Sequence, residues 1–457
     1  MISQECDFYA AVIPEFHCTD EYIEKTYYYR HYVLRRNLSA PGTGYLKHPV
    51  FYEGKQGGYA RLITASASLI LDECRWWRDP RYGYGHMLNC MENLPYHGIF
   101  RDLWVNEIRS LDWPGYEEWI SRAMADYLLV HPDQVMAEKV IEAGYHNIQG
   151  LLQHKDKNNN YLLNPGGHHM TQEHAPSFTS FDDYRDWYDY TDIERVEFQA
   201  FFYGNIVGIA RLMQLLGDKR YAELYELAAK IRQAVIASMW DKEDDFFYAV
   251  RESDGIKAKC KEANGFLAFL FDLVPYKKPY TNIFRYFIDD RYFWNPYPVS
   301  SCAKDVPSYT PHTQMWGNQR KRAGCTWSGP TWPYMNSLLV NVLAGLLRKE
   351  LSYDITMEHF RNFFQLLTQL HFEDGIPMIR EDYDGIDGTP RGCADYLHST
   401  YIDLVVRYAL GVDPSRKEIS DLQPMLGLDA SIEGFPLGGK LWNISIDKSG
   451  HCKVVCV

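Results

Sequence analysis

The sequence has no stretch of about 18 consecutive apolar residues, so it predicts no membrane-spanning helix. Its first residues also lack the basic and apolar regions of a secretory signal peptide, although a start trimmed from a longer chain would hide one. The 10 cysteines are scattered, and the nearest pair, Cys452 and Cys456, does not have CxxC spacing. These absences favour a cytoplasmic protein with free thiols and no membrane partner.

Clusters of basic residues are missing as well, and the formal net charge is -13. Phosphate binding requires grouped Lys and Arg, so we expect no nucleic-acid partner. The signatures GxGxxG, P-loop and GxSxG are absent, which leaves nucleotide binding and serine-esterase chemistry without support. No residue set has standard metal-ligand spacing, so we expect no metal or other cofactor in the chemistry. The sequence does not indicate an oligomeric state.

Aromatic residues are abundant by contrast. They make up 15% of the chain, with 35 Tyr and 12 Trp, and many lie in segments rich in Gly and Pro. Flat aromatic faces stack on the C–H faces of sugar rings, and sites that bind sugars therefore collect Trp and Tyr. This composition favours a small-molecule carbohydrate as the substrate.

Helical periodicity dominates the chain. Apolar residues recur at three- and four-residue steps through 206–216 and again through 219–240, with Gly217 as the cap between them, which predicts a helical hairpin. Ten further candidates follow the same pattern: 21–38, 59–76, 81–94, 112–129, 133–153, 261–274, 279–291, 329–349, 354–371 and 394–411. Twelve helices in six pairs predict an all-α fold, an (α/α)6 barrel over residues 1–412. Asp133 and Asp354 are expected to cap two of them.

The C-terminal residues differ from the rest, because apolar and polar residues alternate from Gly434 to the end. A turn at 447–450 divides this stretch, which predicts a β-hairpin packed on the barrel. We therefore expect a β-rich extension over 413–457.

Long loops interrupt the helices at 41–58, 154–193, 292–328 and 372–393. Loops of this length in a compact fold are usually functional, and in a helical barrel they would gather at one end. Two of these regions carry acidic residues between aromatic ones: 177–198 and 372–401. Glycoside hydrolysis needs two facing carboxyl groups, which stand about 6.5–9.5 Å apart in inverting enzymes. We therefore expect one catalytic carboxyl group from each region. Calcium is the weaker interpretation of the Asp/Gly-rich second region, which lacks EF-hand spacing.

A third segment, 325–339, places a Gly-Pro turn before a helix. Trp327 and Trp332 are expected to present flat faces to a pocket, and Asn336 lies on the same helix face as Trp332.

These segments resemble the glycoside hydrolase family 63 group, which includes processing α-glucosidases and mannosylglycerate hydrolases. The matches to its W-x-G-P-x-W-x-x-x-N signature are Trp327, Gly329, Pro330, Trp332 and Asn336. Glu381, Tyr383 and Gly388 match the stretch that carries the general base, and Asp182 with Trp187 matches the stretch that carries the general acid.

The resemblance implies an inverting hydrolase of an α-linked glucoside or related saccharide, with Glu381 as base and Asp182 as acid. Here Asp183-Tyr184 follows the acid, which departs from the family and leaves Asp183 and Asp186 as alternatives. Substrate contacts are expected from Trp327, Trp332, Tyr383, Gly329, Asn336, Trp187 and Asp183. The family's early Trp-Asp pair is replaced either by Trp77-Arg78-Asp79 or by Arg101-Asp102-Leu103-Trp104.

Two other functions remain open at this point. A sugar epimerase or isomerase on the same barrel would use the histidines His168, His169 and His174 as acid and base. A sugar-binding protein without catalysis would have lost one of its carboxylates. Product analysis separates these functions, because only a hydrolase releases two molecules from one.

Overall fold

The computed structural model describes residues 2–55, 58–111, 115–166, 172–181, 192–312, 326–349, 355–416, 418–419 and 421–457. Helices account for most of its regular structure, as the apolar periodicity predicts. None of the helices within these residues is both long and apolar enough to cross a membrane.

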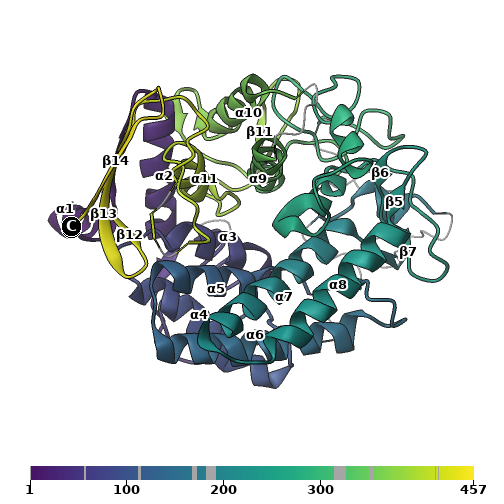
Figure 1. Cartoon of the computed structure of the whole chain (residues 1–457), viewed down its shortest axis with the longest axis horizontal. Coiled ribbons are helices and arrows are strands. Elements are labelled where there is room, and N and C mark those ends of the chain that lie inside the picture. The colour runs from purple at the N-terminus through teal and green to yellow at the C-terminus, as the bar shows by residue number, and fades with distance from the viewer. Residues whose placement is uncertain are drawn as a thin grey trace.

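Six inner helices form a closed ring in the described part of the chain. Each contacts the next, and the last contacts the first (Figure 1). They are α3 (Thr64–Cys74), α5 (Ile120–Val130), α7 (Val196–Leu216), η4 (Ala263–Asp272), α9 (Pro333–Arg348) and α11 (Tyr401–Tyr408). Outer helices alternate with them along the chain: α2 (Glu21–Asn37), α4 (Arg81–Asn93), α6 (Gln134–Lys155), α8 (Tyr221–Ser238), η5 (Tyr280–Tyr286) and α10 (Met357–Gln369). This confirms the predicted (α/α)6 barrel, in which η4 and η5 are 3₁₀ helices.

Short polar side chains and one glycine set the helix ends. Asp133 accepts a hydrogen bond from the backbone N–H of Met136, as its position before α6 predicts. Gly217 ends α7 with a left-handed backbone (φ 78°), which glycine adopts without steric cost. Asp354 lies outside the described residues, and the residue before α10 is Thr356, whose hydroxyl caps that helix.

The C-terminal strands belong to a sheet larger than the predicted hairpin. Its order is β1 (Glu15–Cys18), β12 (Ala430–Leu437), β13 (Lys440–Ile446) and β14 (Cys452–Cys456), all antiparallel. Neither β1 nor the N-terminal helix α1 (Ile2–Val12) was predicted. Because β1 pairs with β12, this sheet takes a strand from each side of the expected boundary at 412 and 413.

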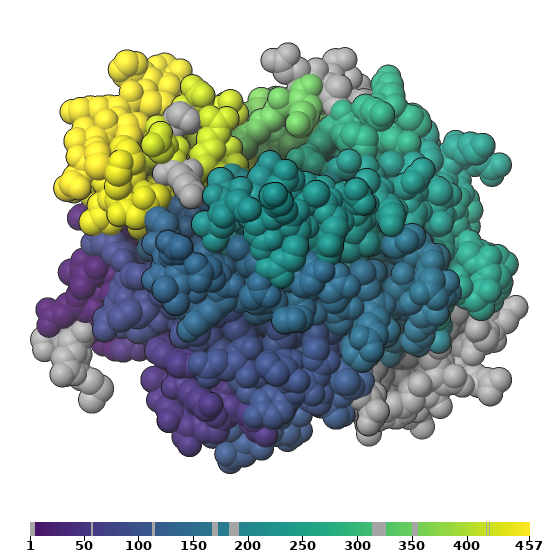
Figure 2. All heavy atoms as spheres, turned by 60° about the horizontal axis from the view of Figure 1, so that its bottom comes forward, coloured from purple at the N-terminus to yellow at the C-terminus, as the bar shows by residue number. Residues whose placement is uncertain are grey.

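The sheet packs on the ends of two inner helices. Phe435 of β12 stacks on Trp76, just after α3, with ring centroids 4.9 Å apart. The backbone N–H groups of Gly438 and Gly439 donate to the carbonyls of Leu129 and Val130 at the end of α5. The C-terminal segment, yellow in Figure 2, therefore forms one corner of the molecule.

The remaining short elements lie in the connections. They are β2 (Leu38–Ser39), β3 (Val50–Phe51), η2 (Leu94–Tyr96), η3 (Pro176–Thr179), β4 (Ile193–Glu194), β5 (Trp240–Asp241), β6 (Phe246–Phe247), β7 (Val250–Arg251), β8 (Phe372–Glu373) with β9 (Ile376–Pro377), and β10 (Asp382–Tyr383) with β11 (Pro390–Arg391).

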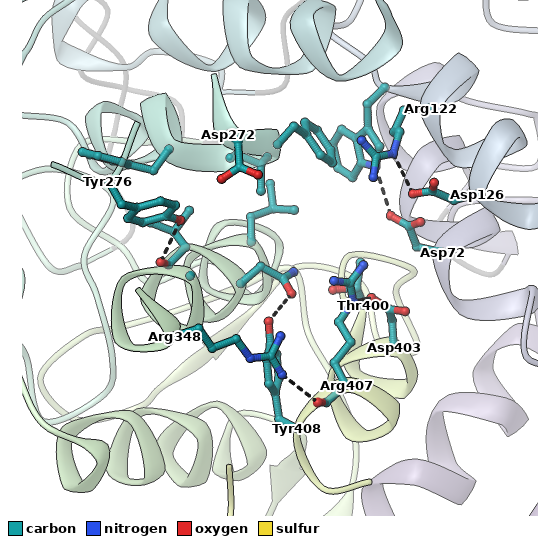
Figure 3. A pocket seen from close by; sticks show the side chains of 18 residues that line it. Asp72, Arg122, Asp126, Asp272, Tyr276, Arg348, Thr400, Asp403, Arg407 and Tyr408 are labelled. Carbon is teal, nitrogen blue, oxygen red and sulfur yellow. Dashed lines mark hydrogen bonds and ion pairs between the residues drawn. The ribbon is translucent and has the colours of Figure 1, made fainter. Parts of the chain in front are cut away.

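A cavity of about 220 Å³ lies inside the ring, lined by residues of α3, α5, η4, α9 and α11 and the residues next to them (Figure 3). Paired charges line it. Arg122 donates to Asp126 at 2.7 Å, and Arg407 donates to Asp403 at 2.6 Å. Arg75, which is fully buried, also donates to Asp403. This network of ion pairs ties α3, α5 and α11 together.

Candidate active site

The long connections of the barrel all precede an inner helix. They span 38–63, 94–119, 156–195, 239–262, 287–332 and 370–400, whereas the connections at 75–80, 131–133, 217–220 and 273–279 are short. Because inner and outer helices alternate, the inner helices run in one direction and their N-terminal ends form one rim. The described parts of the four loop regions singled out in the sequence therefore lie at the same rim.

The two most specific sequence motifs meet at this rim. Thr331 and Tyr383 form an isolated antiparallel bridge, with N···O distances of 2.8 and 2.9 Å in the two directions. This bridge joins the segment of Trp327 and Trp332 to β10, which directly follows Glu381. Backbone hydrogen bonds thus bring these two motifs together.

Glu381 is largely buried in this rim. Its backbone N–H donates to the carbonyl of Arg391, and its carboxyl group lies against Gly392 so closely that a Cβ there would be 2.4 Å from Oε2. Burial raises the pKa of Glu381 to about 6, the Asp382 and Glu53 charges add to this, and His398 opposes it. A carboxylate with such a pKa is ionised at neutral pH and accepts a proton readily.

A buried, hydrogen-bonded pair of side chains, His398 and Glu53, lies beside Glu381. His398 Nε2 contacts Glu53 Oε1 at 2.9 Å, and Tyr396 donates its hydroxyl to Glu53 Oε2 at 2.9 Å. Burial opposes ionisation of Glu53, but His398 and these hydrogen bonds outweigh it and lower the pKa of that carboxyl group. His398 Nδ1 is buried and has no hydrogen-bond partner among the described residues, so it is available to a ligand hydroxyl. Sequence analysis missed His398 and Tyr396, which only the fold brings to Glu53.

Trp327 and Trp332 stack on each other. Their ring centroids are 4.2 Å apart with 9° between the planes, and both side chains are 1% exposed. Trp332 Nε1 donates to the carbonyl of Thr326, whereas Trp327 Nε1 is buried without a hydrogen-bond partner among the described residues. The pair therefore lies below the surface of the rim, and the Trp327 indole N–H remains able to donate a hydrogen bond.

Three other predicted site residues have contacts that hold the rim together. Gly329 has φ 139°, and a Cβ there would lie 2.0 Å from the carbonyl oxygen of Thr310. Asn336 donates to the carbonyls of Val299 and Trp332. Tyr383 donates its hydroxyl to the carbonyl of Leu370 at 2.5 Å and accepts from the N–H of Arg380. Substrate contact by these three residues stays a prediction.

The two segments that were candidates for the family's early Trp-Asp pair lie at different ends of the barrel. Trp77 and Asp79 belong to the short connection 75–80, which is opposite the rim, and Trp77 donates to His31 in the core. Asp102 belongs to a rim loop, where its Oδ1 accepts from the N–H and hydroxyl of Thr64 at the start of α3. Of the two alternatives, only the segment with Asp102 shares the rim with Glu381.

A fully buried arginine anchors another rim loop. Arg195 donates to Glu197, to Gln172 Oε1 at 2.6 Å and to Ser177 Oγ at 3.2 Å. Glu262 approaches the same guanidinium at 3.3 Å. Burial raises the pKa of Glu197 above its usual range, although Arg195 opposes this. Arg195 thus joins the chain before the predicted acid, at Gln172 and Ser177, to the chain after it, at Glu197.

Several predicted residues lie outside the described residues: Asp182, Asp183, Asp186, Trp187, His168 and His169. Their roles stay predictions. His174 is described, and its backbone carbonyl accepts from Ser328 Oγ at 3.1 Å, which ties the histidine-rich loop to the segment of Trp327.

Solved structures share this fold. A sialidase superposes with a TM-score of 0.83 at 19% identity, covering 99% of this chain and 41% of that one. The GH63 mannosylglycerate hydrolase from Thermus thermophilus in complex with glucose gives 0.64 at 16% identity, covering 83% and 99%. Neutral trehalase from Saccharomyces cerevisiae gives 0.52 at 14% identity, covering 82% and 79%. The chain thus spans about two fifths of the sialidase, and these likenesses define the class as (α/α)6 barrels.

A family model identifies the protein family within this class of fold. The model of the mannosylglycerate hydrolase MGH1-like glycoside hydrolase domain matches residues 41–399. The chain belongs to this family of glycoside hydrolase domains, and the resemblance drawn from the sequence is confirmed.

Proposed function

We propose that this domain hydrolyses an α-linked glucoside or related small saccharide with inversion at the anomeric carbon. Glu381 is the general base, and Asp182 is the general acid, with Asp183 and Asp186 as alternatives. One observation carries the proposal: the Thr331–Tyr383 bridge brings Glu381 and the tryptophan segment together at the rim where the long loops gather.

The proposed reaction depends on Glu381 being ionised. Its carboxylate removes a proton from a water molecule, which attacks the anomeric carbon on the face away from the leaving oxygen. The acid on the opposite side gives its proton to that oxygen. Inversion requires the two carboxyl groups to stand about 6.5–9.5 Å apart, so that a water molecule fits between Glu381 and the sugar.

Binding would rest on polar groups that lack protein partners among the described residues. His398 Nδ1 and Trp327 Nε1 are both buried in this way, and each can bond to a sugar hydroxyl. Trp332, Tyr383 and Trp187 are proposed as aromatic walls, with Gly329, Asn336 and Asp183 around them. The chemistry needs no metal or cofactor.

The pH profile should report the pKa of Glu381. Because the base acts only when ionised, kcat/KM should fall about tenfold per pH unit below about pH 6. In His398→Gln the acidic limb of the pH profile should move to higher pH, because His398 lowers the pKa of Glu381 and glutamine does not. Initial rates from pH 4 to 8 check this. If kcat/KM of the parent instead fell with a midpoint near the ordinary glutamate pKa of about 4.3, the role of Glu381 would be contradicted.

Substrate screening tests the assignment as a whole. Natural α-linked disaccharides, glycosylglycerates and aryl α-glycosides would be incubated with the parent and with Glu381→Gln, and free sugar measured. The proposal expects release of a sugar from at least one α-linked compound, and only by the parent. Isomerised sugar without cleavage would instead favour the epimerase.

A further inference from the structure

The cavity in Figure 3 lies apart from the residues proposed for the reaction. Its lining includes Trp119 and Thr400, which directly precede α5 and α11, and Asp272 and Arg348, which are the last residues of η4 and α9. Within the described part of the chain, it contains none of the residues proposed for catalysis or substrate contact. A ligand in this cavity would therefore occupy a second site.

A buried tyrosine contacts both the cavity wall and the rim. The ring of Tyr334, which is 0% exposed, lies 6.1 Å from the ring of Trp119 in the cavity wall. It also lies 6.1 Å from the ring of Trp327 and 5.4 Å from that of His398, which belong to the rim. The cavity and the rim are therefore joined by a layer of packed rings.

The charges at the cavity wall and directly behind it cancel. Three arginines pair with three aspartates: Arg75, Arg122 and Arg407 with Asp72, Asp126 and Asp403. Arg122 and Arg407 each donate to their aspartate through Nε. A guanidinium has more N–H donors, and a carboxylate more acceptor sites, than one such contact uses. The cavity thus offers donors and acceptors side by side without a net charge.

Three polar groups of the lining have unused hydrogen-bonding capacity among the described residues. The hydroxyl of Thr400, which is 2% exposed, has no hydrogen-bond partner. Arg348 donates only to two backbone carbonyls, both at 3.4 Å, and the Asp272 carboxylate has no hydrogen bond or ion pair. A buried hydroxyl without a partner costs free energy, and a ligand hydroxyl would remove that cost. The opposite charges of Arg348 and Asp272 also cancel.

The wall formed by η4 and the residues after it has an uncommon backbone. The consecutive residues Phe271 and Asp272 have φ 57° and 61°, left-handed conformations that cost free energy for residues other than glycine. Space for the Phe271 ring comes from Gly204, where a Cβ would lie 2.4 Å from that ring. Space for Tyr276 comes from Gly345, where a Cβ would lie 2.3 Å from the tyrosine hydroxyl. Strained residues and close glycines therefore hold aromatic rings at the cavity wall.

We propose that this cavity binds a neutral polyhydroxy compound, one sugar ring or a polyol of that size. The balanced charges disfavour an ion, whereas guanidinium and carboxylate groups at one wall suit hydroxyls, which both donate and accept hydrogen bonds. Aromatic rings of Trp119, Tyr276 and Tyr408 provide apolar surface. The volume of about 220 Å³ is below the roughly 300–1,000 Å³ of pockets for larger, drug-sized ligands. The inference does not depend on the proposed hydrolysis.

Calorimetric titrations of the full chain test this binding. The probes are D-glucose, D-mannose, D-galactose and myo-inositol, at concentrations up to about 50 mM. We expect at least one of them to bind, and we expect Arg348→Met to weaken that binding at least about tenfold, because a charged donor is lost. Thr400→Val, which keeps the shape of the side chain but removes its hydroxyl, should weaken it as well. If the rim binds the same compound, the parent should show two binding events, and the variants should keep the rim event at unchanged affinity.

The matched control is Arg291→Met, which removes an exposed arginine that pairs with Asp289 outside the cavity. It should bind the compound like the parent, and thermal midpoints would show that all variants are folded. If Arg348→Met did not fold, Asp272→Asn, at another exposed position of the lining, would take its place. Failure of the parent to bind any probe, or binding that neither Arg348→Met nor Thr400→Val weakens, would overturn the proposal. Binding of the amino acid glycine but of no sugar or polyol would overturn it too, because the unpaired charges would then select a zwitterion.

Discussion

In Glu381→Gln, turnover should fall at least about a hundredfold while the sugar still binds. Glutamine keeps the size and most hydrogen-bonding capacity of the side chain, but it cannot take a proton from water. The largely buried position against Gly392 makes an isosteric change necessary, because a smaller side chain would also leave a void. Rates would be measured with the best substrate of the screen, and affinity by calorimetry.

A neighbouring carboxylate serves as the matched control. Glu373, from the same rim loop, pairs with Arg380 at 2.8 Å and lies on β8. Glu373→Gln should keep activity within a few-fold of the parent. If Glu381→Gln also stayed within a few-fold, Glu381 would not be the base.

The second large effect concerns the stability that the ion pairs around Asp403 give to the barrel. Asp403 is 2% exposed, accepts from Arg75 and from Trp76 Nε1, and pairs with Arg407. Burial disfavours its charge, but the two arginines outweigh this and hold the pKa of Asp403 below its usual range. Asp403→Asn leaves buried guanidinium charge uncompensated and should lower the free energy of unfolding by about 3–5 kcal/mol.

Urea denaturation followed by circular dichroism would measure this loss. Glu142→Gln, which breaks an exposed pair with Arg220 between α6 and α8, is the control and should cost at most about 1 kcal/mol. Equal free energies of unfolding for the two variants would show that the ion pairs of Asp403 contribute little to the stability of the fold.

The barrel could be predicted because each of its helices carries its own periodic pattern. The twelve predicted segments correspond to the inner and outer helices, with errors at their ends, such as 59–76 for α3 (Thr64–Cys74). The N-terminal helix α1 and strand β1 were missed. A strand as short as β1 has too few residues to show alternation, and its partner β12 lies more than 400 residues away.

The site could be predicted only where a local motif marks it. The segments of Trp327 and Glu381 were identified separately, and their contact through Thr331 and Tyr383 is now observed. The Glu53–His398 pair has no local signal, because its members are 345 residues apart in sequence. Arg195 is likewise paired with residues distant in sequence, Gln172 and Glu262, which no local signal connects to it.

The most direct test of the central claim is the configuration of the first sugar released. Proton NMR spectra recorded during the first turnovers of an α-linked substrate, before mutarotation, distinguish the two anomers. A general base at Glu381 that activates water predicts that the β-anomer accumulates first. Initial release of the α-anomer would mean a retaining mechanism with a covalent intermediate, and would contradict the proposed role of Glu381.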